Sequence, residues 1–102
     1  MTLPETWQPI AEGAAANLTA ELARELSPGH PLSAIPVAAV ALGPDPDDVL
    51  FRLLDGSGRL AVVHLTWRQG IESLPWPFTT LYDDEAAWLS HAHAEGCETA
   101  DA

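Results

Sequence analysis

The residue best suited to chemistry is His64, which lies in the apolar stretch LAVVHLTW at residues 60–67. An imidazole titrates near neutral pH and can bind a metal ion or move a proton. His64 and Arg52 are both hydrogen-bond donors, so together they could bind an anion on a sheet surface. The alternatives are a histidine stacked beneath a loop tryptophan or bonded to a nearby carboxylate. Since nothing identifies a nucleophile beside His64, we expect no catalytic residue.

Two further patterns contain residue types that ligate metals. His91, His93 and Cys97 form H-x-H-x-x-x-C, in which only His93 and Cys97 can share one helix face. Two ligands fall short of the four usual for structural zinc. The loop GPDPDD at residues 43–48 lacks the ligand spacing of a calcium loop, so we expect a solvated turn. No phosphate-loop, dinucleotide-binding or hydrolase motif is present in the sequence, and we expect neither a metal nor a cofactor.

Four tryptophans are a large aromatic content for a chain of 102 residues, and tryptophan is common at binding hot spots. We expect Trp67 and Trp88 to lie in the core. Trp76, held between Pro75 and Pro77, is the best candidate for a surface anchor. The alternative is a proline-braced loop that folds onto the sheet.

The charge balance excludes several partners. Fifteen acidic residues against four basic ones give a formal net charge of −11, which repels phosphate backbones and anionic membranes. Such a surface suits a basic partner, although acidity can also serve solubility alone. The chain has a single cysteine, an N-terminus without a secretory signal pattern and apolar runs too short to span a bilayer. These features predict a cytoplasmic protein.

The hydrophobic pattern predicts the elements that position these residues. Leu18, Leu22 and Leu26 form a narrow stripe on a helix over residues 11–26, with Glu21 and Glu25 off the stripe. The proline- and glycine-rich residues 27–31 end that helix. Three strands are expected at about Ile35–Leu42, Val49–Leu54 and Leu60–Trp67, and the alanine-rich first one could instead be helical. FTTLY could add a short edge strand. A final helix with Asp83 as N-cap should turn Trp88, Leu89 and Ala92 inward.

The loop D-G-S-G at residues 55–58 indicates a type I turn with a left-handed Gly58 and a three-residue hairpin loop. Phe51 then lies near Val63. One face of the hairpin is wholly apolar, and the other carries Arg52, His64 and Thr66 among apolar residues. A face of that kind is usually covered by another element or by another molecule.

The chain resembles a small bacterial family of unassigned function. The resemblance rests on PGHPL, on the strand block that ends in VVHLTW, on the WP-T segment PWPFTTLY and on Trp88, and it covers roughly residues 20–90. It implies a fold and no mechanism.

These observations predict one α+β domain, with a mainly antiparallel sheet of three or four strands, an N-terminal helix and a C-terminal helix. The core should span about residues 11–94, followed by a flexible acidic tail over 95–102. The leading functional hypothesis is that the chain is a non-enzymatic acidic module that binds another protein, for example as an immunity or inhibitor protein against a basic toxin. This hypothesis also allows a homodimer. The alternative is a small-ligand or enzymatic site in a pocket around Arg52, His64, Thr66, Trp67 and Trp76.

Overall fold

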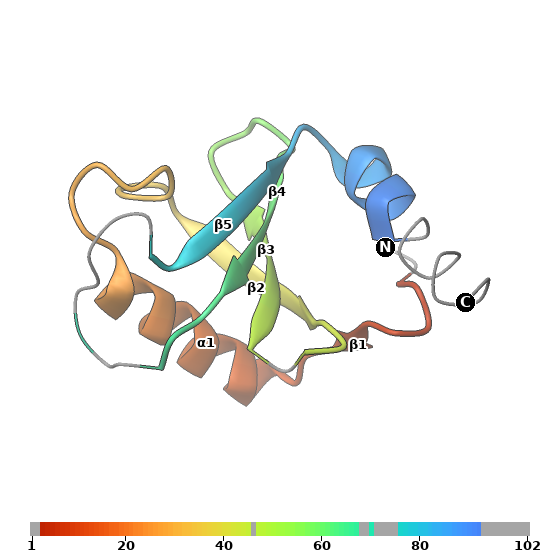
Figure 1. Cartoon of the computed structure of the whole chain (residues 1–102), viewed down its shortest axis with the longest axis horizontal. Helices are drawn as coiled ribbons and strands as arrows, with labels where there is room; N and C mark the ends of the chain where they lie inside the picture. Colours follow the sequence, from red (N-terminus) through yellow and green to blue (C-terminus); the bar gives the residue numbers. More distant parts are fainter. Residues whose placement is uncertain (1–2, 46, 68–69, 71–75, 93–102) are drawn as a thin grey trace.

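The computed structural model describes residues 3–45, 47–67, 70 and 76–92. Its five strands form one antiparallel sheet in the order β1-β2-β3-β4-β5. They are β1 (Gln8–Pro9), β2 (Val37–Leu42), β3 (Asp48–Leu53), β4 (Leu60–His64) and β5 (Phe78–Tyr82). Helix α1 (Glu12–Glu25) lies against one face, and a helix over residues 85–92 lies against the other (Figure 1). The α+β class is confirmed, with one strand more than the three or four expected.

Helix α1 forms because alanine and leucine lose little side-chain entropy in a helix. Leu18 and Leu22 are buried against the sheet, as their spacing predicts. Glu21 and Glu25 lie off the leucine stripe and are nevertheless fully buried, because the covered arc of the helix is wider than that stripe. The chain turns away from the helix through Gly29, whose φ of 94° lies in the left-handed region that favours glycine.

The β3–β4 hairpin pairs Phe51 with Ala61. The sequence predicts a partner two residues further along β4, because it centres the turn on Ser57, whereas the observed pairs are centred on Gly56. Residues 54–59 connect the two strands, and Gly56 joins Gly58 in the left-handed region, with φ of 84° and 77°. A shift of two residues returns each side chain to its face, so the division of the apolar residues between the two faces is still as predicted.

Strand β2 confirms the strand reading of the alanine-rich segment and contains a β-bulge between Ala39 and Ala41. The bulge interrupts the alternation of side chains, so that Val40 and Ala41 both belong to the face opposite α1. Leu42 then returns to the face that packs on α1.

Both faces of the sheet are covered by apolar side chains. The core beneath α1 consists of Leu18, Leu22, Leu32, Val49, Phe51, Leu53, Ala61, Val63 and Leu65. The core on the second face, which we define as the face opposite α1, consists of Trp7, Ala41, Leu50, Leu60, Trp88 and Ala92. The rings of Trp7 and Trp88 meet edge to face, with centroids 5.2 Å apart. This cover explains why the second face is more apolar than a solvated sheet surface.

The short edge strand expected over FTTLY is present as β5. In the helix that follows, Asp84 Oδ1 accepts the N–H of Ala87 at 2.8 Å, so the N-cap is Asp84 and not Asp83. Trp88 and Ala92 are buried, as predicted.

Trp67 departs from its predicted place in the core, since its side chain is 44% exposed and β4 ends before it at His64. His93, Cys97 and the predicted tail over 95–102 lie outside the described residues. None of the described helices is long and apolar enough to cross a membrane.

Candidate functional site

The observed register of the β3–β4 hairpin places Asp48 directly opposite His64. An ionised carboxylate can only accept hydrogen bonds, so His64 Nδ1 donates to Asp48 Oδ1 across 2.7 Å. This hydrogen bond raises the pKa of His64 above its ordinary value of 6.5. Partial burial opposes the rise, and the negative charges of Asp48, Asp45 and Asp47 add to it. His64 therefore remains a cation at a higher pH than a free histidine does.

A shallow groove crosses the second face beside this pair. It consists of two adjoining hollows, of about 210 Å³ and about 260 Å³, which share Asp48, Val62, Tyr82 and His91. The first hollow is completed by Trp7, Pro44, Asp45, Trp88 and Ala92, and the second by His64, Phe78 and Thr80. We refer to the two hollows together as the groove.

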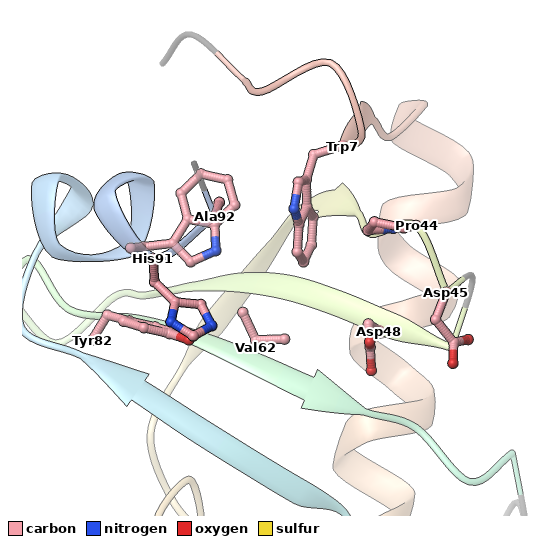
Figure 2. Close-up of a pocket in the computed structure, with 9 residues that line it drawn as sticks. Trp7, Pro44, Asp45, Asp48, Val62, Tyr82, His91 and Ala92 are labelled. Carbon is pink, nitrogen blue, oxygen red and sulfur yellow. The ribbon is translucent and has the colours of Figure 1, made fainter. Parts of the chain in front are cut away.

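Figure 2 shows how the elements contribute to the first hollow. Val62 projects from the sheet at its floor, and Trp7 reaches down over the sheet from the N-terminal segment. Tyr82 and His91 stand at one end, with ring centroids 5.6 Å apart, and two aspartate carboxylates stand at the other. Aromatic surface and negative charge therefore line the same small space.

The aspartates of the loop GPDPDD have separate roles at this end of the groove. The backbone N–H of Asp47 donates to Asp45 Oδ1 at 2.9 Å, which forms the tight turn that sequence analysis expects. The Asp47 carboxylate in turn accepts the indole N–H of Trp67 at 3.0 Å. At the start of the loop, a Cβ on Gly43 would lie 2.9 Å from the ring of Trp7, so this position suits glycine alone.

The same loop contains the residue types that could hold a metal ion. The ligand atoms of Asp45, Asp48 and His64 all lie within 4.8 Å of one another. Carboxylate and imidazole ligands suit ions such as Mn²⁺ or Zn²⁺. However, His64 Nδ1 is engaged by Asp48, and Asp45 is exposed, so the contacts present describe an ion pair with a neighbouring carboxylate.

Of the five residues that the sequence proposes for binding, the structure brings only His64 into the groove. Arg52 pairs with Leu60 at the far end of β4, about 13 Å from His64 at the usual rise along a strand. Trp76 is 39% exposed and packs on Phe78, with ring centroids 4.2 Å apart. Arg52, His64 and Trp76 therefore do not line one pocket.

Thr66 and Trp67, the other two, are held through their backbones by a buried carboxylate. Glu25 Oε1 accepts the N–H of Thr66 and Oε2 accepts the N–H of Trp67, both at 3.0 Å. Trp67 needs such support because its φ of 59° is in the left-handed region. Burial raises the pKa of Glu25, contact with Glu21 raises it further, and the two N–H groups lower it, with a net rise above 4.5.

His30, which the sequence marks only as part of the GHPL turn, connects that turn to β5. The N–H of Leu32 donates to His30 Nδ1 at 3.0 Å, so the ring carries its proton on Nε2. His30 Nε2 then donates to the carbonyl oxygen of Pro77 at 2.9 Å. Pro77 follows a cis peptide bond, and Thr79 Oγ1 also lies 3.3 Å from Nε2. The histidine is 4% exposed and acts as a structural tie.

Sequence reasoning missed Asp48, Tyr82, His91 and Trp7 as groove residues. The signal that could have found Asp48 is hairpin register, since pairing centred on Gly56 brings it opposite His64. Comparison with protein-family models, with curated proteins and with solved structures gives no match, so the site is interpreted from its own geometry.

Proposed function

We propose that this chain is a non-enzymatic, acidic protein-binding module whose groove receives a basic side chain of a partner protein. The observation that carries the proposal is the combination of carboxylates, from Asp45 and Asp48, with aromatic side chains in one groove. A guanidinium or ammonium group gains from both, through charge attraction and through contact with ring faces.

The size of the groove is compatible with a partner's side chain. Each hollow, at about 210 Å³ and about 260 Å³, is smaller than the roughly 300–1,000 Å³ typical of small-molecule sites, although the two together fall within that range. The net charge of −11 supports a basic partner, because it speeds the approach of a positive surface from a distance. An immunity or inhibitor protein that acts in the cytoplasm against a basic toxin would have these properties.

The Asp48–His64 pair supports a second candidate, a small-ligand or enzymatic site. A carboxylate that holds an imidazole through Nδ1 is the arrangement that positions a general base. The two candidates differ in what His64→Gln does. The variant keeps a hydrogen-bonding group, so binding of a basic partner should weaken by less than about tenfold, or 1.4 kcal/mol. A folded variant that loses ligand binding or turnover entirely would favour the second candidate.

The direct test is an NMR titration with two short alanine-rich peptides that differ at one position, arginine in one and neutral citrulline in the other. We expect the arginine peptide to shift the resonances of Trp7, Val62 and Tyr82, and the citrulline peptide to leave them unchanged. Raising the salt concentration should weaken the interaction.

Charge-matched variants separate the groove from the acidic surface as a whole. Asp48→Asn should weaken arginine-peptide binding by about three- to fivefold, near the upper end of the range for an exposed ion pair. Glu5→Gln removes the same charge at an exposed position outside the groove and should have little effect. Equal losses in the two variants, with shifts scattered over the molecule, would show that the peptide binds the surface without a site.

A further inference from the structure

Strand β5 is the last strand of the sheet, and its outer edge has no strand beside it among the described residues. The strand sequence FTTLY contains no charged residue, in a chain with a net charge of −11. Its side chains are also exposed: Phe78 is 50% exposed and Leu81 is 39% exposed. We propose that β5 is a dimer interface, at which a second copy of this chain pairs antiparallel with β5 and extends the sheet.

The physical basis is the outer edge of β5, beside which the described residues place no other strand. Its N–H and C=O groups can accept another strand, and proteins usually prevent this with lysine, proline or inward-pointing charges. Strand β5 contains none of these. Two residues before Phe78, Trp76 packs its ring edge to face against Phe78 with ring centroids 4.2 Å apart, which adds exposed aromatic surface beside the edge. Such a surface is depleted of charge and rich in aromatic rings, as the centres of protein interfaces are.

The distribution of charge around β5 favours a second copy as the occupant. Antiparallel pairing centred on Thr80 places Phe78 opposite Tyr82 of the second copy, so the uncharged strand is self-complementary over its whole length. The acidic residues that follow β5, Asp83 and Asp84, then lie opposite the uncharged Pro77 and Trp76 of the other copy. Like charges are therefore kept apart at the edge, which a parallel arrangement would not achieve.

The dimer has a consequence for the groove, which rests on the proposed function. Thr80 lines the groove and pairs with Val62, so it faces the second face of the sheet. Residues paired across antiparallel strands share a face, so the dimer presents both grooves on one side of a continuous sheet. A partner with two basic side chains could then bind both copies at once.

Sedimentation measurements over a range of protein concentrations test the dimer directly. We expect a monomer–dimer equilibrium that strengthens with added salt, because salt screens the repulsion between two acidic copies. Thr80→Lys places two like charges opposite each other at the centre of the interface and should abolish the dimer. Leu54→Lys makes the same change of charge on the β3–β4 loop, at a side chain that is 53% exposed, and should leave the dimer unchanged.

Cysteine cross-linking tests the register without relying on a disruptive variant. With Cys97 changed to serine, Thr80→Cys should form a disulfide dimer rapidly, because directly paired Cα atoms lie about 4.5–5.5 Å apart, within disulfide range. Leu81→Cys, one residue along the same strand, should cross-link at least tenfold more slowly. A chain that is monomeric at every concentration and salt, or equal cross-linking at both positions, would overturn the proposal and leave the edge to a strand of another protein. Salt also separates the two proposals, because it should strengthen the dimer and weaken arginine-peptide binding.

Discussion

Replacing Glu25 gives the sharpest test of how the end of β4 is held. The Glu25 carboxylate is fully buried, and its two oxygens accept the backbone N–H groups of Thr66 and Trp67, both at 3.0 Å. Glu25→Leu removes both acceptors and leaves two donors unpaired, at about 1–3 kcal/mol each. Because Trp67 is partly open to water and leucine gains from burial, we expect a net loss of about 2–4 kcal/mol in the free energy of unfolding.

Glu25→Gln tests the charge separately from the hydrogen bonds. The pKa of Glu25 is raised in the folded protein, chiefly by burial, so its contribution to stability is complete below 4.5 and is lost as the pH rises through the folded pKa. Glutamine cannot ionise and loses no stability over that window. The stability of the wild type relative to the glutamine variant should therefore fall as the pH rises from about 4.5 towards neutrality.

Urea denaturation followed by circular dichroism, at intervals of pH from about 4 to 8, measures both effects. The exposed Glu5→Gln serves as the charge-matched control, and differences from the wild type cancel the titration of the other carboxylates. If the loss caused by Glu25→Gln grew with rising pH, Glu25 would be acting as a stabilised anion. The two backbone donors would then outweigh burial, contrary to this reasoning.

Three further predictions concern single side chains. Gly58→Val should lower the free energy of unfolding by about 1–2 kcal/mol in urea denaturation, because the φ of Gly58 is 77°. Space is not the cause, since an added Cβ meets no atom within 4 Å at Gly58 or at Gly13, where Gly13→Ala should cost nothing. Equal stability of the Gly58→Val variant and the wild type would refute the left-handed role of Gly58. NMR titration should place the pKa of His64 above 6.5, and Asp48→Asn should lower that pKa. The stability linked to His64 is present below pH 6.5 and is lost as the pH rises through the folded pKa. An unchanged His64 pKa in the Asp48→Asn variant would contradict the pairing. His30→Ala should cost about 1–3 kcal/mol in the same denaturation assay, since it unpairs the N–H of Leu32 while the Pro77 carbonyl oxygen still accepts Thr79 Oγ1, and a loss below about 0.5 kcal/mol would show that water replaces the ring.

The faces of the hairpin could be predicted from the sequence, but its register could not. Side chains alternate along a strand, so the apolar pattern of β3 and β4 assigns each residue to a face whatever the loop. The loop sequence D-G-S-G is compatible with a turn centred on Ser57 or on Gly56, and the structure has the second, with Gly56 and Gly58 both left-handed. That choice decides which residue lies opposite His64, and hence whether Asp48 is seen as its partner.

Buried polar contacts between distant segments were also beyond the sequence. The position of Glu25 off the leucine stripe does not indicate burial. Its burial depends on the backbone N–H groups of Thr66 and Trp67, which are about 40 residues away in the sequence. Strand β1, with only two residues, has no pattern long enough to predict. Trp7 in turn enters the second core because β1, which directly follows it, pairs with β2 at the edge of the sheet. The groove is therefore a product of tertiary packing and not of any one motif.

The sharing of β3 and β4 between two cores links the groove to the whole domain. Phe51 points to α1 and the adjacent Leu50 points to the tryptophan core, and both are fully buried. Neither α1 nor the tryptophan core can separate from the sheet without exposing one face of β3 and β4. Local opening at these two strands therefore coincides with global unfolding. A ligand seated against Trp7 and Trp88 would then stabilise the entire chain by mass action, and its occupancy could be read as a rise in melting temperature.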